Sequence, residues 1–193
     1  MLRQLLEGNK RFVDGKLEHP GRKPEDFRAL AEGQSPHAVI LGCADSRVPP
    51  ELLFDQGVGD LFVVRVAGNV VLGAGAAVKG SIEYAVAVLN VPLVMVLGHS
   101  KCGAVEAALK RAGGGEAPPG AVKDLVGFIQ AAADKVKDRP GDKLGNAIRA
   151  NVALGVERLR TLPPVLAERV KQRRLKVVGA VYDLRTGRVE VVP

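Results

Sequence analysis

Five residues of the sequence have side chains that could act together chemically: Cys43, Asp45, Arg47, His99 and Cys102. They include both cysteines of the chain and one of its three histidines. Two thiolates and an imidazole form a nitrogen-and-sulfur set that suits zinc, whereas a closed structural zinc site has four ligands. The set therefore indicates a metal site with one open coordination position, as in catalytic zinc sites.

Simpler explanations exist for each of these residues. The two cysteines could form a disulfide or be inert buried thiols, and a lone histidine is more often packed or solvated than a metal ligand. The spacing favours metal, because Cys102 follows His99 by three positions and an acid and a base accompany Cys43. The first twelve residues lack the apolar core of a signal peptide, which predicts a cytoplasmic, reducing location where a disulfide is disfavoured.

Each group of candidate residues follows a short apolar run. Residues 38–41 precede Cys43 and residues 93–97 precede His99, and both runs read as buried parallel strands. In open α/β sheets, sites form at the carboxyl ends of the strands. The sequence therefore predicts that the two groups meet at one edge of a sheet.

The chain resembles the β-class carbonic anhydrases. That family has Cys-x-Asp-x-Arg after its first strand and His-x-x-Cys after its third, as found here at 43–47 and 99–102. Segments 34–36, 62–65 and 80–84 also resemble family segments, in the family's order.

The resemblance implies one Zn²⁺ per chain, held by Cys43, His99 and Cys102, and attack of zinc-bound hydroxide on carbon dioxide to give bicarbonate and a proton. Two thiolates donate more charge to the metal than imidazoles do, so the bound water needs help to ionise. Arg47 has a planar fork that fits the Asp45 carboxylate and would fix it as a hydrogen-bond acceptor. In some members of the family this carboxylate binds the metal instead, so Asp45 is a conditional fourth ligand in a closed state.

The resemblance also implies a substrate pocket. Phe62 and Tyr84 would be its apolar walls, and Gln34 would reach the bound oxygens across a dimer interface. Independently of the resemblance, Gly103 stands at the start of a predicted helix, where its amide would face the anion. Without the resemblance, Phe62 and Tyr84 read as core residues and Gln34 as a surface amide.

An inhibitory bicarbonate site occurs in one subgroup of the family. Arg65 and Tyr182 resemble two of its members, but Ile40 stands where the third, a tryptophan, would be. The site is therefore not expected here, and we predict a zinc that is open at pH 7.

Hydrophobic patterning predicts a single α/β domain over residues 1–193. The expected sheet has four mostly parallel strands and an antiparallel fifth strand at its edge, flanked by helices. The strands are expected at 38–41, 61–66, 92–97, 175–182 and 188–192, and the helices at 2–13, 25–31, 51–54, 76–89, 102–111, 122–136, 144–159 and 165–174. The β-branched run at 61–66 is typical of a strand covered on both faces.

The first helix carries an apolar stripe with no obvious partner before the first strand. Its members are Leu2, Leu5, Leu6, Phe12 and Val13. In the resembled family this helix lies on another subunit, which implies a homodimer or a dimer-based tetramer.

Composition excludes other partners. The net charge of +7 comes from scattered residues, and the densest basic cluster, 169–176, lacks the aromatic residues of a single-strand binder, so no nucleic acid is expected. The longest apolar stretch, 85–97, is interrupted by Asn90 and Pro92 and is too short to cross a membrane.

Two other functions fit the same residues. The substrate could be a carbon dioxide analogue such as carbon disulfide, or the chain could be a zinc-stabilised interaction module without turnover. The second alternative leaves Asp45 and Arg47 without a role, because a structural zinc site needs neither.

Overall fold

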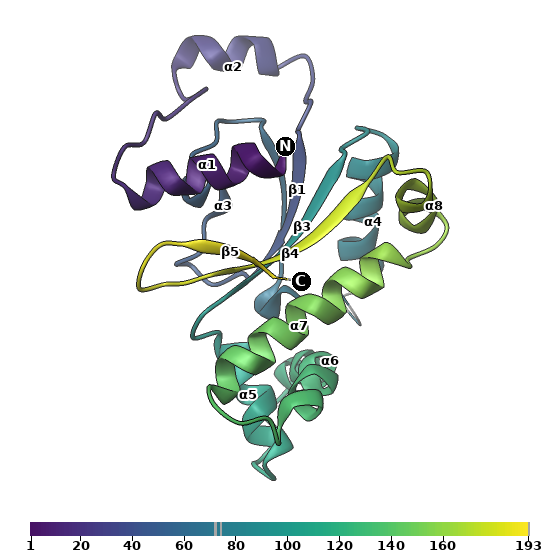
Figure 1. Ribbon diagram of the computed structural model, residues 1–193. Coiled ribbons are helices and arrows are strands. Elements are labelled where there is room, and N and C mark those ends of the chain that lie inside the picture. The colour runs from purple at the N-terminus through teal and green to yellow at the C-terminus, as the bar shows by residue number, and fades with distance from the viewer. Residues whose placement is uncertain (72, 74, 193) are drawn as a thin grey trace.

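The computed structural model describes residues 1–71, 73 and 75–192. Within them, a five-stranded sheet has the order β2-β1-β3-β4-β5 (Figure 1). The strands are β1 (Ala38–Gly42), β2 (Leu61–Arg65), β3 (Leu93–His99), β4 (Lys176–Tyr182) and β5 (Val189–Val192). The first four are parallel, and β5 runs antiparallel to β4 at the edge. The predicted α/β class and strand directions are therefore confirmed.

Helices flank the sheet on both sides (Figure 1). They are α1 (Leu2–Val13), α2 (Pro24–Leu30), α3 (Pro50–Leu53), α4 (Gly75–Ala87), α5 (Gly103–Ala112), α6 (Ala121–Val136), α7 (Lys143–Arg160) and α8 (Val165–Lys171), with a 3₁₀ turn η1 (Ala67–Asn69) after β2. α8 ends before the predicted residue 174, because Arg173 adopts a left-handed φ of 59° that a helix cannot continue through. None of the helices in the described part combines the length and apolarity that a membrane crossing requires.

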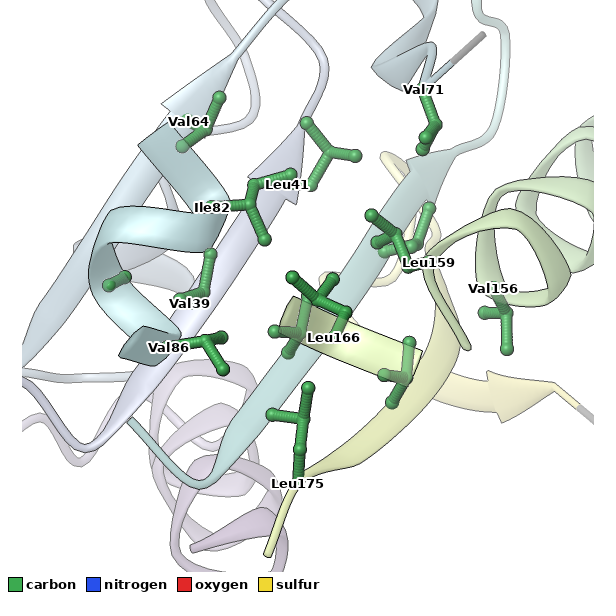
Figure 2. Packing of buried hydrophobic residues seen from close by; sticks show 14 of the residues in the cluster. Val39, Leu41, Val64, Val71, Ile82, Val86, Val156, Leu159, Leu166 and Leu175 are labelled. Atoms are coloured by element: carbon green, nitrogen blue, oxygen red, sulfur yellow. The ribbon is translucent and has the colours of Figure 1, made fainter. Parts of the chain in front are cut away.

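The strands bury both of their faces, because successive side chains point in opposite directions. Val39 and Leu41 of β1 belong to the core beneath α4, α7 and α8, and Figure 2 shows this core with Leu166 of α8 within it. Ala38 and Ile40 belong to the opposite core beneath α1 and α3. This double cover holds the carboxyl end of β1 in place.

β2 is less covered than its sequence predicts. Leu61, Phe62 and Val63 are only partly buried, and Arg65 is exposed. The prediction of a strand covered on both faces is therefore wrong within one chain, in which β2 is an outer strand of the sheet and its faces are only partly covered by other elements.

α1 has a partner within its own chain, contrary to the sequence argument. Leu5 is fully buried in the core beneath α1 and α3. Asn9 donates to the carbonyls of Leu53, at 3.0 Å, and Gly187, at 2.9 Å, and accepts from the amide of Val189. Packing of α1 on a second subunit stays a prediction. The lack of a partner within the chain no longer supports it, because α1 has such a partner.

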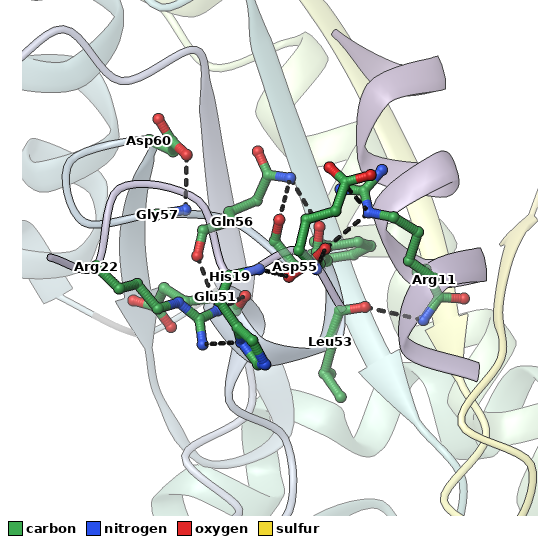
Figure 3. Close-up of polar contacts among 12 residues, drawn as sticks. Arg11, His19, Arg22, Glu51, Leu53, Asp55, Gln56, Gly57 and Asp60 are labelled. Carbon is green, nitrogen blue, oxygen red and sulfur yellow. Dashed lines mark hydrogen bonds and ion pairs between the residues drawn. The ribbon is translucent and has the colours of Figure 1, made fainter. Parts of the chain in front are cut away.

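A buried carboxylate joins α1 to the segment after α3 (Figure 3). Asp55 is fully buried and has a left-handed φ of 46°. It accepts hydrogen bonds from Arg11 Nε at 2.7 Å and from the amides of Glu18 and His19 at 3.0 and 3.1 Å. Although burial opposes its ionisation, these donors hold the pKa of Asp55 below its ordinary value.

Asp55→Asn is expected to lower the free energy of unfolding by about 3 kcal/mol at neutral pH, because it breaks a buried ion pair. A carboxyl whose pKa is lowered by folding stabilises the protein above its unfolded-state pKa of about 3.9, and this stabilisation is lost as the pH falls toward the folded value. Urea unfolding should therefore show the two proteins converging below about pH 4. Asp14→Asn removes an exposed acid paired with Lys10 and is the control; because solvent screens this pair, its difference from the wild type should be much smaller at each pH. A gap between wild type and Asp55→Asn that does not depend on pH would contradict this account.

Candidate metal centre

Three potential ligands come together at the carboxyl ends of β1 and β3. Cys43 follows β1, His99 is the last residue of β3, and Cys102 is the N-cap of α5. Because β1 and β3 are hydrogen-bonded neighbours, their ends bring these residues to one place. One ligand atom from each lies within 4.8 Å of the others, and all three residues are buried. Both cysteines are free thiols.

The imidazole of His99 is oriented for metal binding. Its Nδ1 lies 2.9 Å from the carbonyl oxygen of Ser100, and an N–H there donates to that oxygen. The lone pair is then on Nε2, which is buried and has no hydrogen-bond partner among the described residues. Ligands of a tetrahedral zinc stand about 3.5–3.8 Å apart, which the spacing of the three atoms can accommodate. The donor set and this unpartnered nitrogen therefore fit a zinc ion.

The two thiols oppose each other's ionisation. A hydrogen bond from the Cys102 thiol, together with those from the backbone amides of Asp45 and Gly68, lowers the pKa of Cys43 well below its ordinary value. The pKa of Cys102 is raised, because its thiol donates to Cys43, is buried and faces the Cys43 thiolate. A divalent cation between the two sulfurs would offset this repulsion and favour the doubly ionised pair.

Asp45 and Arg47 form a bidentate ion pair beside the ligands. Asp45 Oδ1 accepts from the amide and Nε of Arg47 at 3.0 and 2.9 Å, and Oδ2 accepts from Nη2 at 2.7 Å. This hydrogen bonding holds the pKa of Asp45 well below its usual range, so the carboxylate is ionised. Its Oδ2 lies 3.9 Å from His99 Nε2. An ionised acceptor thus stands at the edge of the ligand cluster.

Arg65 braces the backbone that carries Cys43. Its Nε donates to the carbonyl of Cys43 at 2.9 Å, and its Nη2 donates to the carbonyl of Asp45 at 2.6 Å. The sequence pointed to Arg65 only through its resemblance to a member of the inhibitory site and missed this contact. The contact follows from the register of the sheet, in which Arg65 at the end of β2 is aligned with Gly42.

The predicted pocket residues do not gather at the ligands of their own chain. Phe62 is aligned with Val39, four residues before Cys43, which is about 13 Å away along a strand. Tyr84 lies beside Phe62, with ring centroids 6.3 Å apart and the ring planes tilted by 39°, and is 46% exposed. Gln34 is exposed and precedes β1, at the opposite end from Cys43.

Gly103 is the one predicted pocket residue beside the ligands. It begins α5 directly after Cys102 and is exposed. A cavity of about 950 Å³ lies next to the centre and is lined by Arg47, Ser100 and Lys101 together with the turn between β4 and β5. Solvent therefore reaches the guanidinium side of the Asp45–Arg47 pair.

Comparison with known proteins gives consistent matches over nearly the whole chain. A family model described as carbonic anhydrase matches residues 38–189. Carbonic anhydrase 2 of Mycobacterium tuberculosis is 46% identical over 185 residues, which cover 95% of this chain and 87% of that protein. The carbonic anhydrase of Pseudomonas aeruginosa is 38% identical over 198 residues, covering 99% and 87%.

Solved structures share the fold. The β-carbonic anhydrase CcaA superposes with a TM-score of 0.80 at 30% identity, covering 100% of this chain and 95% of that one. One of two β-carbonic anhydrases from Sordaria macrospora, described as tetrameric, gives 0.79 at 26% identity, covering 99% and 96%. A Coccomyxa β-carbonic anhydrase in complex with acetazolamide gives 0.77 at 29% identity, covering 100% and 86%.

Proposed function

The chain belongs to the β-class carbonic anhydrases, and from this premise we propose that it hydrates carbon dioxide reversibly to bicarbonate and a proton. The reaction would use one zinc ion per chain, bound by Cys43, His99 and Cys102. The observation that carries the proposal is the buried, unpartnered Nε2 of His99 beside two free sulfurs. Free, adjacent thiols suit a reducing compartment, and we place the protein in the cytoplasm.

The residues around the ligands have distinct roles in this proposal. Zinc, when bound, would supply the Lewis acidity that makes water nucleophilic near neutral pH. Arg47 holds the Asp45 carboxylate through three hydrogen bonds, and Asp45 accepts a hydrogen bond from the nucleophile and orients it. The exposed amide of Gly103, at the start of α5, stabilises negative charge that develops on the substrate oxygens.

Stopped-flow measurement of carbon dioxide hydration tests this function. The zinc-loaded protein should be active, chelation should abolish activity, and added zinc should restore it. Hydration that survives complete metal removal would contradict the proposal, and a zinc-loaded protein without turnover would point to the interaction module. A parallel assay with carbon disulfide distinguishes the analogue as substrate.

We further propose that Gln34, Phe62 and Tyr84 complete the active site of a second subunit. Their distance from the ligands of their own chain supports this, as does the exposure of Gln34 and Tyr84. A partner seated over β2 would also supply the cover that its β-branched sequence predicts. This arrangement requires a homodimer or a dimer-based tetramer.

Subunit mixing tests the shared site. When Gln34→Ala/Tyr84→Ala chains are co-expressed with Cys102→Ala chains, each mixed dimer should contain one intact site. Equal mixing should restore about a quarter of the wild-type activity, because half of the dimers are mixed and each has one of its two sites intact. Both parent variants alone should be much less active.

Co-expression of Cys43→Ala with Cys102→Ala chains is the matched control. All three metal ligands come from one chain, so these mixed dimers contain no intact site and should gain nothing. If the Gln34→Ala/Tyr84→Ala mixture also gains nothing, the pocket residues do not act across subunits.

A further inference from the structure

The sulfur of Cys43 has a hydrogen-bond donor that does not belong to the ligand loops. The amide of Gly68, in the turn η1 after β2, donates to Cys43 Sγ at 3.2 Å in a buried position. Such N–H···S bonds withdraw electron density from a ligating thiolate and make the metal a stronger Lewis acid. This is useful in a site with two thiolates, which otherwise weaken the acidity of the metal.

The backbone conformation of Gly68 is not fixed by the residue itself. Its φ of 72° and ψ of 14° lie in the left-handed region that glycine enters freely and also leaves freely. A side chain is excluded there, since a Cβ would lie 2.6 Å from Ile129 Cδ1 and 3.1 Å from the Cβ of Ala104. The amide needs a second contact to keep its direction toward the sulfur.

Asn151, which is distant in the sequence, provides that contact. It lies on α7, is 8% exposed, and its Nδ2 donates to the carbonyl oxygen of Gly68 at 2.8 Å. One hydrogen bond therefore holds the carbonyl of Gly68 while the amide of the same residue points at Cys43. The contact spans 83 positions of the sequence and joins α7 to the metal centre.

We propose that Asn151 is a positioning residue for the metal centre, which acts through Gly68 to keep an N–H···S hydrogen bond on the ligand Cys43. The inference rests on the proposed metal site and deepens it. Asn151 touches neither the metal position nor the substrate, so its effect is on the electron donation of one sulfur. A residue that only satisfies a buried carbonyl would stabilise the fold without changing that donation.

Cobalt-substituted protein reports the electron donation directly. In Asn151→Leu, which keeps the volume but removes the donor, the sulfur-to-cobalt charge-transfer band should move to lower energy, because the Cys43 sulfur becomes more electron-rich. Competition with a chelator should show zinc binding weakened by about tenfold, as for other partners of metal ligands. Asn146→Leu is the matched control, since Asn146 also lies on α7 and donates to a backbone carbonyl, that of Pro140, at 3.2 Å. It should change neither measurement.

Cadmium-113 NMR keeps the inference testable if Asn151→Leu does not fold. In the wild type, the Gly68 amide proton should show scalar coupling to the metal through the Cys43 sulfur, and Asn151→Asp should lose it because a carboxylate cannot donate. Absence of this coupling in the wild type, or an unchanged band and coupling in folded variants, would overturn the inference. Failure of the wild type to bind cobalt or cadmium through sulfur would instead overturn the proposed metal site, so the two failures are distinguishable.

Discussion

Cys102→Ala is expected to lose its zinc and its carbon dioxide hydration together. Two ligands cannot replace the three that the centre brings within 4.8 Å, so metal content should fall from about one per chain to near zero. Activity should fall by more than about 100-fold, beyond the range typical for partners of metal ligands. The variant should also unfold more easily in the presence of zinc than the wild type does, because metal binding contributes to folding stability. Metal analysis, stopped-flow assays and thermal unfolding measure the three effects on one preparation.

Val105→Ala separates the loss of a ligand from the loss of packing. Val105 lies on the first turn of α5, is 1% exposed and belongs to the same apolar cluster as Cys102. Its truncation should cost about 1–2 kcal/mol of stability and leave the metal content unchanged. A Cys102→Ala protein that is fully loaded with zinc and active would refute the ligand assignment.

Arg47→Ala is expected to lower activity most at low pH, with partial recovery as the pH rises. Removal of Arg47 raises the pKa of Asp45 toward its ordinary value of about 3.9, so the carboxylate stays ionised above about pH 6. The loss at low pH therefore does not come from protonation of Asp45. It would come from release of the carboxylate, which lies 3.9 Å from His99 Nε2 and would then be free to bind a metal held there. Hydroxide competes with the carboxylate for the metal, and the competition favours the open arrangement at higher pH.

Three measurements check this prediction. Spectra of the cobalt-substituted variant across pH should show a change of the fourth ligand that the wild type does not show at neutral pH. Arg47→Lys, which keeps the charge but loses the planar fork, should resemble Arg47→Ala. Arg174→Ala, in the exposed segment between α8 and β4, is the control and should behave like the wild type. Because Ile40 stands in place of the tryptophan of the inhibitory site, added bicarbonate should inhibit wild-type activity only to the extent expected of a reaction product. Carboxylate ligation in the wild type at neutral pH would make Asp45 a regular ligand and contradict the open site.

Local patterns were sufficient to predict most of the fold. Apolar runs before Cys43 and His99 identified β1 and β3, and their parallel pairing follows from the helices between them. That pairing is also why residues more than fifty positions apart could be expected at one sheet edge. The orientation of His99 was not readable, because it depends on a bond to the carbonyl of Ser100.

What sequence could not show depends on contacts between distant backbone segments. Arg65 and Asn151 act on backbone carbonyls, and no side-chain pattern marks the carbonyl that a residue will reach. Gly68 is one of 23 glycines, and its amide becomes informative only when it is seen facing Cys43. The sequence around Phe62 indicates an apolar strand residue, but it does not show whether the residues that bury its side chain belong to the same chain or to another.

The bonds of Asn9 bear on the order in which the chain folds. A single amide joins residues 44 and 178 positions away, so α1 can complete its contacts only after the turn near Gly187 has been synthesised. Closure of so long a loop is entropically costly before other contacts have formed. We therefore expect α1 to dock late, after the parallel strands have paired. Contacts formed after the transition state govern mainly how fast a protein unfolds. The contacts that Asn9 makes between the two ends of the chain are therefore expected to slow unfolding and to leave the folding rate nearly unchanged.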